Sequence, residues 1–435
     1  MKALRADLLD FTSAPAWGDT ASTGVRWRAD HWLIIGDDGR IAAVQAEPPG
    51  PGIERHDHRG RLLMPGFIDT HVHSPQLGVM ASWGTELLDW LHTYTFPAER
   101  AWADPALAAA GSAQFLDALL AHGTTAAVVF PTVHKGSVDA LFNAAQARGM
   151  RIVAGKVLMD RHAPDGLRDD VAQAERDCVD LIQRWHGRGR CCYAVTVRFA
   201  PTSTPEQLAM AGALCRADPT LYMQTHVAEN PSEVRWVAEL FPQARSYLDV
   251  YAGAGLLHAR SVLAHGIWLD DDDRAALRDA GAQIAFCPSS NLFLGSGLFD
   301  WPGSVAAGVA VSMASDVGGG TSLSMQRTLA DGYKVQALRA RDRAADGLTA
   351  WCALHAATRG AARSLSLGHE IGTLEPGLMA DLCLWDWSTG AVDGARQNRA
   401  RDLHEKLFAW MLLSDERHLV RTWVAGEERF TRDTP

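Results

Sequence analysis

The sequence predicts an α/β protein whose core is a (β/α)8 TIM barrel, with a small discontinuous β-domain built from both termini. Eight short, nearly continuous apolar runs and the longer helix-like stretches between them predict the barrel. Strands of a parallel sheet are buried on both faces and read in this way, and strand–helix alternation implies parallel pairing. Strand-like segments in both flanks predict the β-domain. An open doubly wound sheet is the alternative arrangement.

The length fits this division. The chain has 435 residues, and a (β/α) barrel typically takes about 250. We assign residues 65–371 to a barrel with long loops, and residues 1–64 and 372–435 to the small domain. Because neither end alone has enough strands for a stable sheet, we expect the two ends to pair.

Each barrel strand is predicted from a run rich in β-branched and other apolar residues. The eight runs are residues 66–73, 124–130, 151–159, 193–199, 221–227, 261–266, 282–287 and 309–316. Between them, Asp104-Pro105 and Thr204-Pro205 are typical helix starts, with a capping side chain before a proline. Residues 271–281 end on a glycine, as helices often do.

The flanks read as strands and one helix. Residues 25–35 and 41–46 flank a GDDGR turn, which predicts a β-hairpin. Near the C-terminus, residues 372–386 and 419–425 are strand-like and residues 399–413 helical. His56 and His58 precede the barrel in a polar turn, and we expect them to be solvated.

Composition limits the partners. With 41 basic and 51 acidic residues the net charge is −10, which opposes binding to nucleic acid polymers but not to a free base or nucleoside. No run of 18 apolar residues occurs, and the N-terminal MKALRADLLDF lacks a signal peptide's apolar stretch. We expect no membrane partner and a cytoplasmic location. Seven scattered cysteines without a CxxC pair argue against disulfides and a thiolate zinc site.

His71 and His73 stand two residues apart on the first predicted strand. Side chains at this spacing project to one face, so both imidazoles can reach one metal ion. An isolated HxH pair is as often a pair of buried structural histidines as a pair of metal ligands. Here the pair ends a barrel strand, where active sites of this fold gather.

Four further groups lie at the ends of predicted strands: His226 and, three residues later, Glu229, then His265 and Asp316. Each of these residues, taken alone, could have a purely structural role. Their common position at the ends of strands 1, 5, 6 and 8 favours a metal site. Imidazole and carboxylate ligands suit Zn²⁺, with Fe²⁺ a lesser possibility. Such a metal lowers the pKa of bound water to about 7, and Glu229 is placed as general acid/base.

These motifs resemble the amidohydrolase superfamily and, within it, the guanine deaminases. The resemblance covers most of residues 65–330. The HxH pair and the strand-8 aspartate are shared across the superfamily, while SPQ after HxH, TFPAE and RFAP are more specific. The similar segments, in order, are PGFIDTHVHSPQLG, LLDWLHTYTFPAE, VRFAPT, THVAEN, LAHGIWL, CPSSNLFLGSG and SDVGGGTSLSM.

The resemblance implies a role for each matching residue. His71, His73, His226 and Asp316 would be metal ligands, and His265 would orient the water or touch the metal. Glu229 and Asp316 would shuttle protons. Gln76, Arg198 and Phe199 would hold the purine, next to His226 and Glu229. An amide offers both a donor and an acceptor, and arginine offers a fork to a carbonyl oxygen.

One Zn²⁺ per chain is expected. Dinuclear relatives bridge two metals with a carboxylated lysine on strand 4, but predicted strand 4 carries Arg198 and no lysine, while Lys156 falls on strand 3. The family also implies a homodimer. Residues 86–96 look like a loop helix covering the site, although a dimer contact is an alternative. The glycine-rich VGGGTS lacks the lysine of a phosphate-binding loop and reads as a tight turn.

The expected activity is hydrolysis of a C–N bond in a cyclic amidine: deamination of guanine to xanthine and ammonia, in purine catabolism or salvage. Alternatives are deamination of a modified purine, a pterin or an aminotriazine, hydrolytic ring opening of a cyclic amide, and a non-catalytic barrel that binds metal or purine. The other zinc deaminase class needs H-x-E and P-C-x-x-C, which this sequence lacks.

Overall fold

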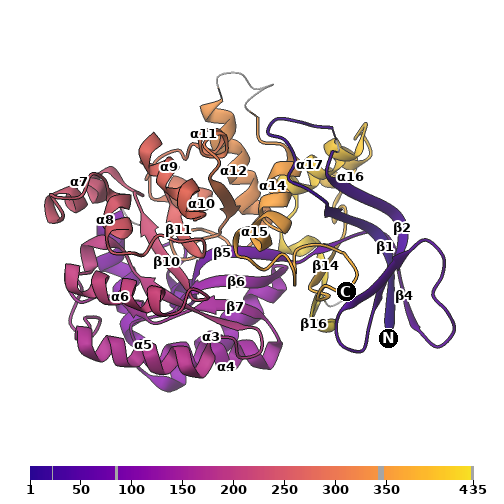
Figure 1. Ribbon diagram of the computed structural model, residues 1–435. Coiled ribbons are helices and arrows are strands. Elements are labelled where there is room, and N and C mark those ends of the chain that lie inside the picture. Colours follow the sequence, from indigo (N-terminus) through magenta and orange to yellow (C-terminus); the bar gives the residue numbers. More distant parts are fainter. Residues whose placement is uncertain (22, 84–86, 341–346, 433–435) are drawn as a thin grey trace. The chain divides into compact units, whose positions relative to one another are not determined.

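A computed structural model describes residues 1–21, 23–83, 87–340 and 347–432 (Figure 1). Its Cα atoms cluster into two compact units. One comprises residues 1–69, 117–126 and 323–435, and the other residues 70–116 and 127–322. The predicted domains, 1–64 with 372–435 and 65–371, follow the two sheets and stay a prediction. In the described part of the chain, no helix combines the length and apolarity needed to span a bilayer.

A nearly closed parallel barrel confirms the predicted fold class. Its strands lie in the order β5-β6-β7-β9-β10-β11-β12-β13, and β8 pairs with β9. The run predicted as residues 151–159 is divided between β7 and β8. The bounds are β5 Phe67–His73, β6 Thr124–Phe130, β7 Arg151–Ala154, β8 Val157–Leu158, β9 Cys191–Val197, β10 Tyr222–Val227, β11 Ser261–His265, β12 Gln283–Phe286 and β13 Ala310–Met313.

Polar side chains link the first and last strands of the barrel. Thr70 on β5 donates its hydroxyl to the Met313 carbonyl at 3.0 Å. Ser312 on β13 donates to Thr70 Oγ1 at 2.9 Å and to Gln283 Oε1 at 2.8 Å. Just beyond, the Asp316 amide donates to the His71 carbonyl at 2.9 Å. These bonds bring the ends of β5 and β13 together, and with them two of the predicted metal ligands.

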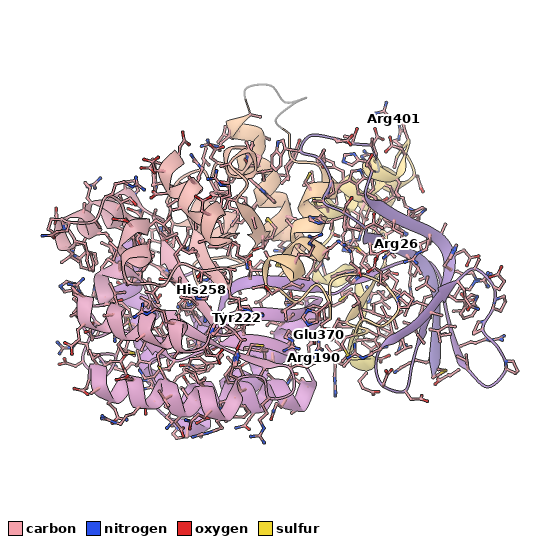
Figure 2. The ribbon with its side chains drawn as sticks, in the orientation of Figure 1. Arg26, Arg190, Tyr222, His258, Glu370 and Arg401 are labelled. Atoms are coloured by element: carbon pink, nitrogen blue, oxygen red, sulfur yellow. The ribbon has the colours of Figure 1, made fainter. Side chains whose placement is uncertain are left out.

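At the opposite, amino end of β10 an aromatic ring packs against an arginine. Tyr222 begins β10 (Figure 2), and its side chain is fully buried. The Arg260 guanidinium lies 5.0 Å from the centre of its ring. In barrels of this kind, this end contributes stability, whereas the carboxyl ends of the strands carry the chemistry.

The helices around the barrel begin and end as the caps predict. Thr204 caps α6 by accepting from the Gln207 amide, and Gly281, at φ 69°, ends α9. Helices α4, α5 and α6 lie outside the strands (Figure 1). The bounds are α3 Pro105–Ala121, α4 Lys135–Arg148, α5 Val171–Trp185, α6 Pro205–Ala217, α7 Pro231–Leu240, α8 Tyr247–Gly253, α9 Asp271–Ala280, α10 Pro288–Phe293, α11 Trp301–Ala306 and α12 Met325–Arg339.

Strands from both termini form the second sheet, as predicted. Seven strands lie in the order β16-β15-β14-β4-β1-β2-β3. Its core includes Leu33, Leu63, Leu382 and Trp423. The bounds are β1 Lys2–Phe11, β2 Val25–Ile35, β3 Ile41–Gln45, β4 Glu54–Pro65, β14 Leu382–Trp385, β15 Leu419–Val424 and β16 Glu427–Thr431, with helices α14 Ala350–Ala356, α15 Arg359–Ser364, α16 Ala391–Gln397 and α17 Leu403–Leu413.

One expectation about this sheet is wrong. His56 and His58 lie on β4, not in a turn, and His58 is buried against the Trp423 ring at 6.4 Å between centroids. Burial, with repulsion from nearby arginines, lowers the pKa of His58 to about 4. The polar side chains of this segment did not indicate a strand. The strand forms because its backbone pairs with β1, and that pairing does not depend on apolar side chains.

Candidate active site

Three histidines and one aspartate converge at the carboxyl ends of the barrel strands. His71 and His73 come from β5 and His226 from β10, while Asp316 follows β13. His73 Nε2 lies 3.2 Å from His71 Nε2 and 3.3 Å from His226 Nε2. Asp316 Oδ1 lies 3.2 Å from the Nε2 atoms of both His71 and His73. We call these four residues the metal-ligand group, after the role that the resemblance implies for them.

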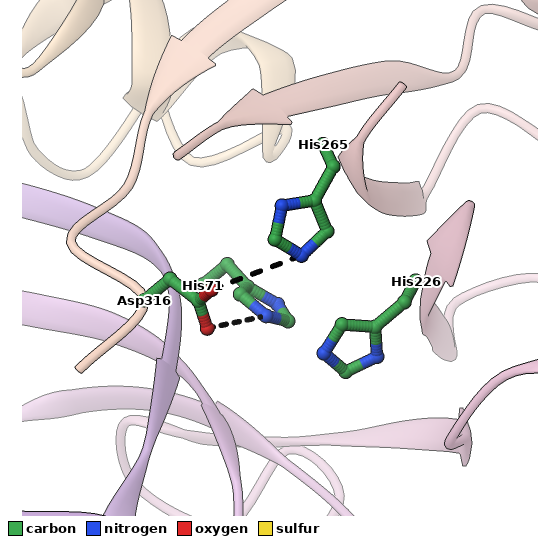
Figure 3. A group of neighbouring side chains, drawn as sticks. All are labelled: His71, His226, His265 and Asp316. Carbon is green, nitrogen blue, oxygen red and sulfur yellow. Dashed lines mark ion pairs between the residues drawn. The ribbon is translucent and has the colours of Figure 1, made fainter. Parts of the chain in front are cut away.

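The spacing of these atoms fits a metal ion. Zinc bonds to nitrogen and oxygen ligands at about 2.0–2.2 Å, so tetrahedral ligand atoms stand about 3.3–3.5 Å apart. The printed separations of 3.2 and 3.3 Å are close to that value. His265 is near enough to take part, because ligand atoms of His71, His226, His265 and Asp316 all lie within 4.8 Å of one another (Figure 3).

The protonation states also suit metal binding. Burial lowers the pKa of His71 to about 4. Burial and the neighbouring histidines hold the pKa of His226 well below its usual value. Burial opposes ionisation of Asp316, but hydrogen bonds and attraction from His71, His73 and His265 bring its pKa well below the ordinary range. Neutral imidazoles beside an ionised carboxylate are the forms that bind metal.

Glu229 faces the metal-ligand group from the turn after β10. Its side chain is buried, with Oε2 3.4 Å from His265 Nε2, and Ser296 donates its hydroxyl to Oε1 at 3.0 Å. Burial, together with the nearby carboxylates of Glu233 and Asp316, raises the pKa of Glu229 to about 7. A carboxyl group that titrates near neutral pH can both give and take a proton.

His265 ends β11 and lies between the two carboxylates. Its Nε2 is 3.8 Å from Asp316 Oδ2 (Figure 3) and 3.4 Å from Glu229 Oε2. Asn291 Oδ1 is 2.8 Å from its Nδ1, which assigns the Nδ1 proton to this hydrogen bond. Burial alone would lower the pKa of His265, but Glu229 and Asp316 outweigh it and the pKa is raised.

The backbone at these strand ends is unusual. Ala228, His265 and Asp316 have φ angles of 47°, 72° and 49°, in the left-handed region that non-glycine residues rarely adopt. Hydrogen bonds hold the chain there: the Gly266 amide donates to the Val227 carbonyl at 2.9 Å, and the Ile267 amide to the Ala228 carbonyl at 3.0 Å. Such conformations cluster at active sites because they aim side chains that a regular strand could not.

A second group of polar residues lies beside the metal-ligand group. Gln76 belongs to the short helix η1 Ser74–Val79, and Arg198 directly follows β9. Both contact Glu99, which is fully buried in α2 Phe96–Ala101. Gln76 Nε2 donates to Glu99 Oε1 at 2.9 Å, and Arg198 Nη1 lies 2.7 and 2.6 Å from the two carboxylate oxygens of Glu99. We call these three residues the base-reading group, after the purine-binding role that the resemblance implies for Gln76 and Arg198.

A helical segment after strand β5 covers the cavity, as predicted, although Glu86 of that prediction lies outside the described residues. It consists of α1 Leu87–Trp90, a π-helical turn η2 Leu91–Thr95, and α2. Leu87, Trp90 and Leu91 line the cavity from this side. The segment therefore supplies an apolar wall and, through Glu99, an anchor for the base-reading group.

The glycine-rich stretch after β13 is a tight turn, as expected. The Gly320 amide donates to the Asp316 carbonyl at 2.5 Å. Gly318 has φ 118°, and a Cβ built on it would lie 1.8 Å from Gln76 Oε1. Glycine is required there for its backbone conformation and because the Gln76 amide occupies the space of any side chain.

Members of both groups line one small cavity. It combines apolar walls with a few polar groups, as small-molecule sites usually do. The lining residues are His73, Gln76, Leu87, Trp90, Leu91, Arg198, Phe199, His226, Glu229, Glu233, His265, Leu294, Asp316 and Gly319.

Comparisons with known proteins decide the family. Residues 62–429 match the model of the amidohydrolase family. This chain belongs to the amidohydrolase family. Guanine deaminase from Escherichia coli is 40% identical over 438 residues, covering 100% of this chain and 98% of that protein. A probable guanine deaminase from Deinococcus radiodurans is 37% identical, covering 100% and 99%.

Solved structures of other amidohydrolases agree. The structure of E. coli guanine deaminase superposes with a TM-score of 0.94 at 40% identity, covering all of both chains. A guanine deaminase from C. acetobutylicum, solved with guanine bound in its active site, gives a TM-score of 0.88 at 26% identity and covers 99% of this chain and all of that one.

In this amidohydrolase the structure gathers every residue that the sequence singled out for the site. His71 lies behind His73, and the others line the cavity. Three buried contributors were missed: Glu99, Asn291 and Ser296. All three stand in segments that carried the resemblance, LLDWLHTYTFPAE and CPSSNLFLGSG. No local pattern gave them a role, because each acts through a residue far away in sequence.

Proposed function

We propose that the protein catalyses the hydrolytic deamination of guanine to xanthine and ammonia. One observation carries this proposal: a metal-ligand group and a base-reading group face a single cavity in a chain similar over its full length to E. coli guanine deaminase. The guanine bound in the active site of the C. acetobutylicum relative supports the same substrate.

One Zn²⁺ per chain is the proposed metal, held by His71, His73, His226 and Asp316. The support is the 3.2–3.3 Å spacing of their donor atoms and their nitrogen and oxygen chemistry. When bound, zinc supplies Lewis acidity that brings the pKa of a coordinated water to about 7. Fe²⁺ takes similar ligands, so metal analysis belongs to the test.

The proton transfers fall to Asp316 and Glu229. Asp316 Oδ1 faces the histidines, which leaves Oδ2, on the His265 side, to accept the proton of the attacking water. Glu229 protonates the ring nitrogen next to the amino-bearing carbon, which makes that carbon easier to attack. Asp316 then passes its proton to the amino group, which leaves as ammonia, while the added hydroxyl group returns a proton to Glu229 and becomes the new carbonyl of xanthine. His265 is hydrogen-bonded through Nδ1, so its Nε2 faces the reacting atoms and orients the water.

The purine is held on the other side of the cavity. Arg198 donates to the carbonyl oxygen and stabilises the negative charge that builds there during attack. Gln76 bonds the adjacent ring edge, and the Phe199 side chain flanks the base. An enclosed site that uses these edges can reject a purine lacking them by about 10⁴–10⁵-fold.

The test uses purified protein loaded with zinc, with metal content measured. Guanine consumption is followed by ultraviolet absorbance and ammonia release by a coupled assay, with a panel of aminopurines, pterins and aminotriazines in parallel. We expect equal amounts of xanthine and ammonia from guanine and much slower turnover of the panel. No turnover of guanine by fully loaded protein, or faster turnover of a panel member, would contradict the proposal.

A further inference from the structure

Glu99 is a buried carboxylate that the proposed proton transfers do not use. It lies on the covering segment, yet its oxygens are bonded to Gln76 and Arg198, which come from two other parts of the chain. The Arg198 guanidinium also lies over the Phe96 ring, 5.1 Å from its centre. The covering segment is therefore bonded, through Glu99, to both polar residues proposed to face the base.

The chemistry of Glu99 fixes the orientation of the Gln76 amide. A carboxylate paired with a guanidinium only accepts hydrogen bonds, so the amide must turn its NH₂ toward Glu99. Oxygen Oε1 is left over, and among the described residues the side chain of Gln76 has no hydrogen bond other than that to Glu99. The backbone of Gly318 packs against Oε1, which leaves the amide little room to move.

The guanidinium of Arg198 is oriented in the same way. Nη1 faces both oxygens of Glu99, so the other N–H groups of the planar fork are directed elsewhere. Within the described part of the chain they have no hydrogen-bond acceptor, although Arg198 is only 3% exposed and lines the cavity. The cavity wall therefore offers an acceptor from Gln76 next to a donor from Arg198.

We propose that Glu99 is a positioning residue that sets the hydrogen-bond polarity of this wall, so that the site selects a ring N–H adjacent to a C=O, the lactam edge of a purine. This inference rests on the proposed function and names what the site reads in its substrate. Guanine carries this edge at N1 and C6. In 2-aminopurine the amino group is the same, but N1 is an acceptor and the carbonyl is missing.

Glu99→Gln tests the polarity with almost no change in shape. An amide at position 99 can donate to Gln76 Oε1, which lets the Gln76 amide reverse and present NH₂ to the cavity. We expect kcat/KM for guanine to fall and that for 2-aminopurine to rise or hold. Their ratio should drop by about 10²-fold, part of the 10⁴–10⁵-fold selectivity such edges can give. The change in the guanine reaction should fall mainly on KM.

Several controls separate positioning from support of the fold. Glu239→Gln, at an exposed position in α7, should leave the ratio unchanged. Zinc content and melting temperature show whether Glu99→Gln is folded and loaded. Glu99→Asp keeps an acceptor and should keep the preference for guanine while raising KM. Equal losses on guanine and 2-aminopurine in Glu99→Gln would mean that Glu99 only supports the fold, and would overturn the proposal.

Binding to the unaltered protein gives a second measurement that needs no variant. Hypoxanthine has the lactam edge but no 2-amino group, and purine has neither. By calorimetry we expect hypoxanthine to bind at least about 10²-fold more tightly, a difference of about 2.8 kcal/mol. Equal affinities would overturn the proposal even if Glu99→Gln does not fold. If guanine is not deaminated, the proposed function fails, but this comparison still decides whether the wall reads a lactam.

Discussion

The metal-ligand group and the base-reading group share one cavity but are built differently. The three histidines of the first group lie on barrel strands and Asp316 follows β13, and the donor atoms lie 3.2–3.3 Å from their neighbours. In the second group Arg198 directly follows β9, while Gln76 and Glu99 belong to helical segments after β5. In the proposed function, the barrel strands therefore hold the metal ligands, and the covering segment contributes Glu99 to recognition of the base.

This difference has a physical reason. A metal site tolerates little displacement of its ligands. The carboxyl ends of parallel barrel strands are held in place by hydrogen bonds to a neighbouring strand on each side. Recognition of a planar base needs groups in the plane of its edge, and a segment that crosses the mouth of the barrel can supply them. Substrate preference can then change through residues of the covering segment, such as Glu99 in α2, without disturbing the proposed ligands.

Metal removal should separate the two groups most completely. We expect a zinc chelator to abolish turnover of guanine, because the proposed attack needs a water molecule whose pKa the metal lowers. Hypoxanthine affinity should fall by about tenfold or less, or about 1.4 kcal/mol, because Gln76, Glu99 and Arg198 do not ligate the metal. Ammonia assays and calorimetry on the same sample check this, with zinc restored as the control. Full turnover by metal-free protein would contradict the assignment.

Glu229→Gln should disable the chemistry while leaving recognition and metal binding intact. The amide keeps the shape and can still accept from the Ser296 hydroxyl, but it cannot exchange a proton. We expect kcat to fall by about 10²–10⁴-fold, as for the loss of a general acid/base, with zinc content and hypoxanthine affinity unchanged. Glu239→Gln is the matched control. Activity close to that of the parent protein would remove Glu229 from the proposed mechanism.

Asn291→Ala tests a residue that acts on the metal-ligand side of the cavity indirectly, through His265. Without Asn291 Oδ1, His265 loses the partner that fixes its Nδ1 proton. Losses of this kind usually cost about 10–100-fold in activity or metal affinity, and we expect kcat to fall within that range with little change in KM. Asn143→Ala, exposed on α4, is the control. A change confined to KM would place Asn291 in base recognition instead.

Gly318→Ala should affect only the base-reading side and have the smallest effect. The new methyl would meet Gln76 Oε1 at 1.8 Å, so the amide must shift. We expect KM for guanine to rise by about tenfold, the loss of one hydrogen bond of about 1 kcal/mol or more, with kcat nearly constant. Gly136→Ala, where a Cβ meets nothing within 4 Å, is the control. A large fall in kcat would show that the two groups are not separable.

Local sequence was enough to predict the barrel and to place the histidines and Asp316 at neighbouring strand ends, while the resemblance supplied the proposed set of ligands. Strands buried on both faces are continuous in apolar residues, and HxH spacing alone places two imidazoles on one face. The polar half of β4 could not be recognised, because residues 54–61 carry few apolar side chains and join the sheet through their backbone. Glu99 and Asn291 needed the fold, since the residues they orient lie 23 to 99 positions away.

The left-handed backbone at Ala228, His265 and Asp316 lowers the stability of the fold while it positions side chains that the proposed activity needs. Conformations of this kind cost of order 1–3 kcal/mol each, against a total stability of about 5–15 kcal/mol for a typical domain. Glycine at position 265 would relax the main chain, yet it would remove the imidazole that faces both carboxylates. Variants selected only for heat resistance are thus drawn toward inactive sequences at these strand ends, and a thermostable active enzyme must gain its stability elsewhere.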